Sequence, residues 1–233
     1  MTLGDIFRGV IRVCWKASRA VAVVIAWRVA GLFLHLQNVL TDLRLGISAC
    51  ALSDQRQDGK AGDGRGYAPA SYWRLNRMLR HLDPQPADVF LDLGCGRGRV
   101  VCRAAMENFK EVRGVDVDPP MVDAARRNAD RMRGRRSAIK IIQEDVADTD
   151  VSDVTVFFMF LPFGWKTLQQ VLDNIEQSLV VNPRRIRIFY LSGDEYYVLL
   201  DMRHWLKRKG EIGITDIHEW EHRPELATAP NAG

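Results

Sequence analysis

From residue 88 onward, short apolar runs alternate with segments whose apolar residues recur every three to four positions. The runs are typical of buried parallel strands, and the segments between them are typical of amphipathic helices. This alternation predicts an α/β fold, a doubly wound and mostly parallel sheet. We expect strands at 89–93, 112–116, 139–142, 154–160, 185–191 and 211–217, and helices at 72–81, 99–105, 118–133, 168–179 and 196–209.

A different pattern covers residues 1–52, which we expect to form a helical arm. Four basic residues share one face of its first part, and residues 20–36 are apolar except at two positions. An arginine inside an apolar helix costs about 2.5–3.5 kcal/mol in a bilayer, which favours a helix lying on a membrane surface over a spanning one. We therefore expect residues 1–40 to bind a membrane surface. The alternative is that they pack on the chain's own domain or on a second subunit. The polar positions are Arg8, Arg12, Lys16 and Arg19, then Arg28 and His35.

Composition divides the rest of the chain. Residues 53–66 are polar with four glycines, which is typical of a flexible linker. The folded domain is expected over residues 67–222, and residues 223–233 are expected to form a disordered tail.

Residues 1–50 hold six basic and two acidic side chains, a surplus equal to the net charge of +4 of the whole chain. The domain itself is balanced, which argues against nucleic acid as its partner. Four cysteines without a C-x-x-C pair indicate a reducing, cytoplasmic compartment.

The main chemical signal is the sequence D-x-G-x-G-x-G at residues 92–98, between a predicted strand and a predicted helix. Glycines let the backbone approach a ligand closely, and a helix start presents unpaired N–H groups. A phosphate-binding P-loop would end in Gly-Lys-Ser/Thr, and a dinucleotide-binding loop would have glycine in place of Arg99. The carboxylate of Asp92 suits a cationic ligand better than a pyrophosphate.

This pattern resembles motif I of the class I S-adenosylmethionine-dependent methyltransferases. The resemblance implies S-adenosylmethionine as cofactor, with the glycine loop around its amino-acid end and Asp92 near its ammonium group. It also implies that Asp116, or alternatively Asp118, accepts hydrogen bonds from the ribose, and that Asp145 and Val146 contact adenine. The implied cofactor-binding residues are Tyr67, Ser71, Asp92, Gly94, Cys95, Gly96, Gly98, Asp116, Val117, Asp145, Val146 and Phe160.

Upstream of the loop, Tyr67-x-x-x-Ser71 resembles a segment of the non-SET histone-lysine methyltransferases and their small bacterial and mitochondrial relatives. That resemblance implies N-methylation of a protein acceptor. Related families place Asn or Asp before a Pro-aromatic pair after the fourth strand, whereas residues 159–164 (M-F-L-P-F-G) have no polar side chain. A small-molecule or lipid acceptor, and a cofactor-binding module without turnover, stay open as alternatives. The candidate catalytic residues on the acceptor side are Tyr67, Phe163 and Tyr190, with Asp194 and Glu195 nearby.

Residues 218–222 read H-E-x-x-H, a motif that zinc proteases carry on a helix together with a third ligand. Here the motif follows a strand pattern, and Pro224 comes at once. We therefore predict no metal site.

Overall fold

The computed structural model describes residues 28–49, 69–160, 163–191, 195–213 and 216–224. The chain divides into two compact units, Met1–Leu40 and Thr41–Gly233. The described residues of the first unit belong to a helix that covers residues 28–45. No helix within the described ranges is both long and apolar enough to cross a membrane. Residues 1–27 of the expected arm, the expected linker and most of the expected tail lie outside those ranges.

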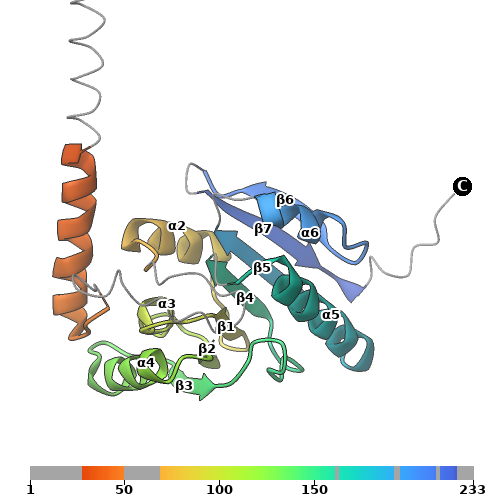
Figure 1. Ribbon diagram of the computed structural model, residues 1–233, viewed down its shortest axis with the longest axis horizontal. Coiled ribbons are helices and arrows are strands. Elements are labelled where there is room, and N and C mark those ends of the chain that lie inside the picture. Colours follow the sequence, from red (N-terminus) through yellow and green to blue (C-terminus); the bar gives the residue numbers. More distant parts are fainter. Residues whose placement is uncertain (1–27, 50–68, 161–162, 192–194, 214–215, 225–233) are drawn as a thin grey trace, which may run out of the picture. The chain divides into compact units, whose positions relative to one another are not determined.

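The second unit is built on a seven-stranded sheet with the strand order β3-β2-β1-β4-β5-β7-β6 (Figure 1). Strands β1 to β5 are mutually parallel, β7 is antiparallel to β5, and β6 is antiparallel to β7. The predicted doubly wound, mostly parallel α/β fold is therefore confirmed. The strands are β1 (Val89–Leu93), β2 (Glu111–Asp116), β3 (Ala138–Gln143), β4 (Val156–Phe160), β5 (Ile186–Leu191), β6 (Lys207–Glu211) and β7 (Ile217–His222).

Helices cover both faces of this sheet (Figure 1). Phe90 of β1 packs in the apolar cluster beneath α2 and α3, whereas its neighbours Val89 and Leu91 pack in the cluster beneath α5. Because successive strand residues point to opposite faces, one strand supplies both cores and reads as an unbroken apolar run. The helices are α2 (Tyr72–Leu82), α3 (Arg99–Ala104), α4 (Pro119–Arg131), α5 (Trp165–Val181) and α6 (Val198–Asp201), with a 3-10 turn, η1 (Glu195–Tyr197), before α6.

Residues 41–49 belong to the second unit, although the sequence analysis placed them in the arm. Leu45, Ile47 and Ala49 are buried in the same apolar cluster as side chains of α2 and α3. The backbone N–H of Arg133, just after α4, donates to the carbonyl oxygen of Leu45 at 2.8 Å. This short segment is therefore part of the packing of the domain.

The predictions for residues 196–217 were wrong. The expected helix ends at Asp201, and residues 207–211 form the edge strand β6. The expected last strand at 211–217 is replaced by β7, which begins at Ile217, so the sheet has a seventh strand. Lys207, Arg208 and Lys209 were read as a helix end, but charged side chains also protect an exposed sheet edge.

Strand β7 escaped prediction because it carries buried charges. Glu219 and Glu221 are 5% and 3% exposed. Glu219 accepts a hydrogen bond from Nε of Arg187 on β5 at 2.7 Å, and Glu221 accepts one from Nε of Arg185 at 2.6 Å. Burying a carboxylate is tolerated when a guanidinium meets it, and that partner cannot be read from the local pattern.

The H-E-x-x-H motif lies on this strand and not on a helix. Nδ1 of His222 hydrogen-bonds the carbonyl oxygen of Trp205 at 2.8 Å, and Nδ1 of His218 contacts Arg208 at 3.2 Å. Within the described ranges, no cluster of three or more His, Cys, Asp or Glu side chains could hold a metal ion.

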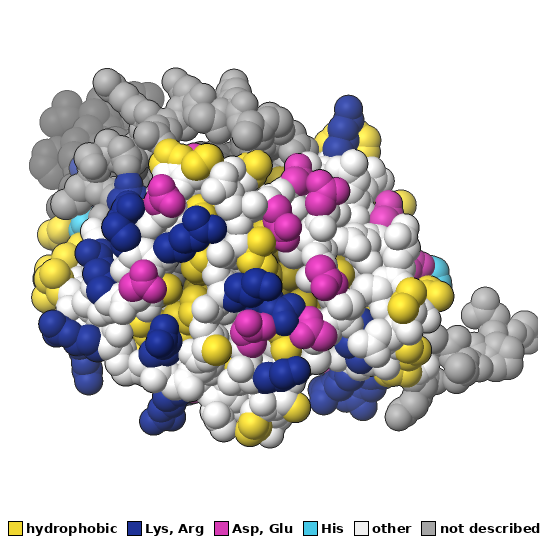
Figure 2. All heavy atoms as spheres, turned by 90° about the horizontal axis from the view of Figure 1, so that it is seen from below, with side chains coloured by type: hydrophobic (Ala, Val, Ile, Leu, Met, Phe, Trp, Pro, Cys, Tyr) yellow, Lys and Arg dark blue, Asp and Glu magenta, His cyan; other side chains and the backbone are white. Residues whose placement is uncertain are grey.

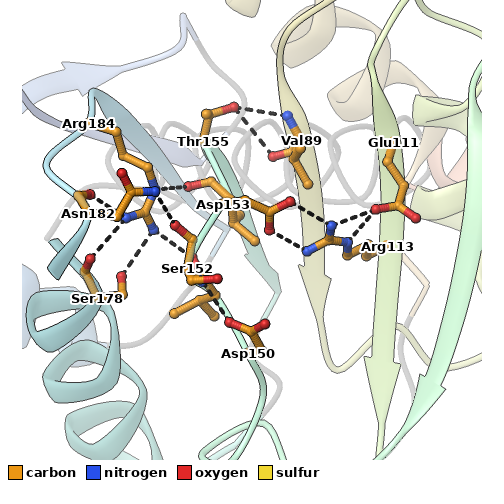
Figure 3. A network of polar contacts seen from close by, with 12 residues as sticks. Val89, Glu111, Arg113, Asp150, Ser152, Asp153, Thr155, Ser178, Asn182 and Arg184 are labelled. Atoms are coloured by element: carbon orange, nitrogen blue, oxygen red, sulfur yellow. Dashed lines mark hydrogen bonds and ion pairs between the residues drawn. The ribbon is translucent and has the colours of Figure 1, made fainter.

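Basic and acidic side chains are interspersed on the face shown in Figure 2. At the amino ends of the strands, a network of charged and polar side chains forms (Figure 3). Arg113 of β2 donates to both carboxylate oxygens of Asp153 at 2.6 and 2.8 Å, and to Glu111 at 2.6 Å. Arg184 donates to carbonyl oxygens in the loop before β4 and in the last turn of α5. Both arginines at this edge of the sheet thus have hydrogen-bond acceptors within the chain, whereas ligands of such folds bind at the opposite, carboxyl edge.

We expect Gly114→Ala to lower the free energy of unfolding by about 1–3 kcal/mol, because the added methyl group overpacks the core. A Cβ at Gly114 of β2 would lie 2.6 Å from Cγ2 of Val101 and 2.9 Å from both Cβ and Sγ of Cys95. Urea denaturation measures the change. The control is Gly31→Ala in the first helix, where nothing lies within 4 Å of the added atom. That variant should be neutral or stabilising by up to about 1 kcal/mol. Unchanged stability of Gly114→Ala would contradict the packing.

Candidate functional site

The glycine loop follows β1 directly and bends tightly into α3. Gly94, Gly96 and Gly98 have φ angles of 81°, 52° and 77°, a region that other residues rarely adopt. The backbone N–H groups of Gly94 and Cys95 both donate to the carbonyl oxygen of Val115 on β2 at 2.9 Å. Gly94, Gly96 and Gly98 therefore leave three positions of the loop without a side chain at the carboxyl edge of the sheet, and a ligand can approach the backbone there.

Asp116, the last residue of β2, joins this loop to the next one. Its Oδ2 accepts a hydrogen bond from the backbone N–H of Gly96 at 2.8 Å, and its Oδ1 accepts one from that of Asp118 at 3.0 Å. Burial raises the pKa of Asp116, and these hydrogen bonds oppose the rise. Each carboxylate oxygen can accept a further hydrogen bond. Val117 beside it is 48% exposed, so an apolar surface borders the carboxylate.

Asp92 of β1 has no such partners. Its side chain is 3% exposed, and none of the described residues donates a hydrogen bond to its carboxylate or forms an ion pair with it. Burial, followed by the nearby charge of Asp116, raises the pKa of Asp92 well above its usual range. An uncompensated buried carboxylate is costly unless a cation or a donor meets it. The residues present therefore fit a cationic ligand, such as a sulfonium with an ammonium group.

Other predicted residues lie at the same carboxyl edge. Asp145 and Val146 follow β3; Asp145 is exposed and accepts from the backbone N–H of Ala147 at 2.9 Å, whereas Val146 is buried. Phe160 ends β4 and is half-buried. Cys95 is buried within the loop, and burial raises the pKa of its thiol, so the side chain is a neutral packing group.

The predicted acceptor-side residues are less accessible. Phe163 and Tyr190 are 6% and 1% exposed and pack in the apolar cluster beneath α5. Ser71 is the N-cap of α2, and its Oγ accepts from the backbone N–H of Arg74 at 3.5 Å. Tyr67, Leu161, Pro162 and Asp194 lie outside the described residues, as does the side chain of Glu195.

Two residues that hold the glycine loop were not among the predicted site residues. Asn128 of α4, 1% exposed, donates from Nδ2 to the carbonyl oxygen of Arg97 at 2.8 Å. Arg99 is 2% exposed although it begins α3. A cation is unfavourable at a helix N-terminus, and an arginine there is a signal that some carboxylate meets it.

The chain is similar to known methyltransferases. Residues 92–181 match the family described as the ANTKMT methyltransferase domain. A protein-lysine N-methyltransferase from Saccharolobus islandicus is 31% identical over 96 residues, which cover 41% of this chain and 59% of that relative. A tRNA U34 carboxymethyltransferase from Mannheimia succiniciproducens is 28% identical over 153 residues, which cover 63% of this chain and 46% of that relative. The chain thus spans about half the length of these curated relatives.

Among solved structures, the human methyltransferase 10 domain containing protein shares the fold. It superposes with a TM-score of 0.54 at 13% identity, over 82% of this chain and 95% of that one. This likeness and the strand order show the fold of the class I S-adenosylmethionine-dependent methyltransferases. The match of residues 92–181 and the methyltransferase relatives support a domain of that class. S-adenosylmethionine is the cofactor of that class, as the resemblance implied.

Two matched substitutions test the electrostatics of the site. Asp92→Asn should raise the free energy of unfolding at pH 7 by about 1 kcal/mol, because it removes a buried charge that lacks a partner. The folded-state pKa of Asp92 lies above the unfolded value, so wild type loses stability as pH rises through that folded pKa. The variant should lack this loss. Urea denaturation across pH measures both effects.

Asp153→Asn is the control with the opposite sign. Its hydrogen bonds to Arg113 lower the pKa of Asp153, so the pair stabilises the fold above the ordinary pKa of aspartate and is lost as pH falls through the lowered value. Because Asp153 is 42% exposed, solvent limits the expected loss at pH 7 to at most about 1 kcal/mol. Destabilisation of both variants by the same amount would contradict the account.

Proposed function

We propose that this chain transfers a methyl group from S-adenosylmethionine to an amine of a protein, with lysine as the acceptor. The observation that carries the proposal is the buried carboxylate of Asp92, which has no partner among the described residues and lies at the carboxyl edge beside Asp116. When bound, S-adenosylmethionine supplies a methyl group on a sulfonium, and its cationic groups would offset this charge.

Eight of the predicted cofactor-binding residues have a role in this proposal. Asp92 faces the ammonium group, and the backbone of Gly94, Gly96 and Gly98 surrounds the amino-acid end of the cofactor. Asp116 keeps its hydrogen bonds to the loop and accepts further ones from the ribose. Asp145 and Val146 at the end of β3 contact the adenine, with Val117 on the neighbouring surface.

A lysine acceptor must lose its proton before it can react. The end of β4 supports this step without a dedicated base, because its last residue, Phe160, is apolar and only half-buried. Apolar surroundings disfavour a charged ammonium and so lower the pKa of an amine that enters them. The protein-lysine N-methyltransferase from Saccharolobus islandicus supports the choice of acceptor.

The test is transfer of labelled methyl groups from S-adenosylmethionine into a cell lysate by the purified full chain. We expect label in protein, recovered as methyl-lysine after hydrolysis. At subsaturating cofactor, Asp116→Ala should reduce transfer by at least about tenfold, as loss of charge-assisted hydrogen bonds predicts. Asp118→Ala tests the alternative ribose contact and should transfer as wild type, because the backbone N–H of Asp118 and not its side chain meets Asp116.

Three other outcomes would contradict the proposal. Label confined to an organic extract or to small molecules would indicate the small-molecule or lipid alternative. Cofactor binding without formation of S-adenosylhomocysteine would indicate a binding module. Label confined to RNA would indicate a nucleic-acid acceptor. The relative from Mannheimia succiniciproducens is named for such a substrate, a tRNA.

We also propose that residues 1–40 contact a membrane surface. In the described part of the first unit, Val29, Leu32, Phe33, Leu36 and Leu40 are all more than half exposed. They recur at the spacing of one helix face. A helix with a continuous exposed apolar face, preceded by basic residues, is typical of interfacial binding.

Sedimentation with vesicles of phosphatidylcholine and phosphatidylserine tests this placement. Replacing Leu32 and Phe33 by Glu should weaken binding at least about tenfold, because it removes two apolar side chains from the lipid-facing stripe. The matched control replaces Val180 and Val181 of α5, which are 78% and 86% exposed, by Glu. The control should bind as wild type. A wild-type chain that stays in the supernatant would contradict the proposal.

A further inference from the structure

A buried ion pair joins the N-terminal segment to the glycine loop. Nη2 of Arg99 donates to Oδ2 of Asp42 at 2.8 Å, and the two side chains are 2% and 4% exposed. Oδ1 of Asp42 accepts a hydrogen bond from the hydroxyl of Tyr72 at 2.6 Å, and Oδ2 accepts one from the backbone N–H of Ala49 at 3.3 Å. Nη1 of Arg99 donates to the carbonyl oxygen of Ala70 at 3.3 Å. Residues 42–49, the start of α2 and the start of α3 therefore meet at one point.

A second link joins the same segment to the same loop. Asn128 of α4 donates from Nδ2 to the carbonyl oxygen of Arg97, and its Oδ1 accepts from the backbone N–H of Ser48 at 2.9 Å. Arg97 and Arg99 are the residues on either side of Gly98, which is the N-cap of α3. The last turn of the glycine loop is thus held on both sides by contacts that lead to residues 42–49.

Stability alone does not account for the ion pair. Burial removes the hydration of both charges, and their mutual attraction barely offsets that cost in free energy. A well-packed apolar pair of similar volume stabilises a fold as much or more. What an ion pair adds is direction, because a guanidinium with several directed donors fixes the positions of the groups that accept from it. Here those groups lie on the segments next to the loop. Arg99, which supplies the donors, directly follows Gly98 of that loop.

We infer that Asp42 and Arg99 are positioning residues for the cofactor, so that affinity for S-adenosylmethionine depends on residues 42–49 of the N-terminal segment. The inference rests on the proposed function, since it concerns the same glycine loop. Gly96, the residue directly before Arg97, donates the hydrogen bond that orients Asp116. A displaced loop would therefore shift both the backbone around the amino-acid end of the cofactor and the carboxylate assigned to its ribose.

The test is calorimetric titration of the full chain with S-adenosylmethionine, combined with thermal melts. The main variant carries Asp42→Leu together with Arg99→Met, which removes both charges and leaves neither one buried alone. We expect a melting temperature close to that of wild type and a Kd at least about tenfold weaker. Arg99→Lys, which keeps the charge but not the directed donors, should also bind more weakly.

The matched control removes a second buried pair, Arg187 and Glu219, whose side chains are 16% and 7% exposed, by Arg187→Met with Glu219→Leu. That pair joins β5 to β7 and does not touch the loop. The Kd of this control variant for S-adenosylmethionine should therefore stay within about twofold of the wild-type value, even where its melting temperature falls. If the Asp42–Arg99 double variant does not fold, Asp42→Asn replaces it, and the same weakening of Kd is expected.

The outcomes separate the two claims. A folded Asp42 variant that binds S-adenosylmethionine as tightly as wild type overturns the inference and leaves the proposed function intact. Equal weakening in the Arg187–Glu219 control also overturns it, because the effect would then follow general stability. Failure of the wild-type chain to bind S-adenosylmethionine contradicts the proposed function itself.

Discussion

Two carboxylates share one buried edge of the parallel sheet, and the arrangement of the site depends on them. Asp92 is the residue before the last of β1 and Asp116 is the last of the neighbouring strand β2, and the charge of Asp116 helps to raise the pKa of Asp92. The glycine loop donates to Asp116, whereas the carboxylate of Asp92 has no partner among the described residues. In the proposed function, stability and binding oppose each other here, because the charge that would attract the cofactor destabilises the chain when no cofactor is bound.

The two edges of the sheet handle charge in different ways. At the amino edge, Arg113 and Asp153 meet directly and the positive and negative groups balance locally (Figure 3). At the carboxyl edge, Asp116 accepts a hydrogen bond from the glycine loop, and the buried guanidinium of Arg99, which follows the loop, is held by Asp42. The fold thereby keeps its own arginine paired and the carboxylate of Asp92 available.

Much of this arrangement could be predicted from the sequence, because its signals are local. Buried parallel strands read as apolar runs, and D-x-G-x-G-x-G fixes a loop whose φ angles only glycine adopts readily. What could not be predicted depends on partners far along the chain. Strand β7 holds Glu219 and Glu221 only because arginines of the β5 region meet them. Likewise, the role inferred for residues 42–49 depends on the hydrogen bond between Arg99 and Asp42, which lie 57 positions apart in the sequence.

A crystal structure of the chain with S-adenosylmethionine tests the central claim most directly. The account predicts the cofactor at the carboxyl edge, with its ammonium group near the carboxylate of Asp92 and its ribose hydroxyls within about 3 Å of Asp116. The Arg99–Asp42 contact should be unchanged from the structure described above. A cofactor bound elsewhere, or one whose cationic groups face away from Asp92, would contradict the account.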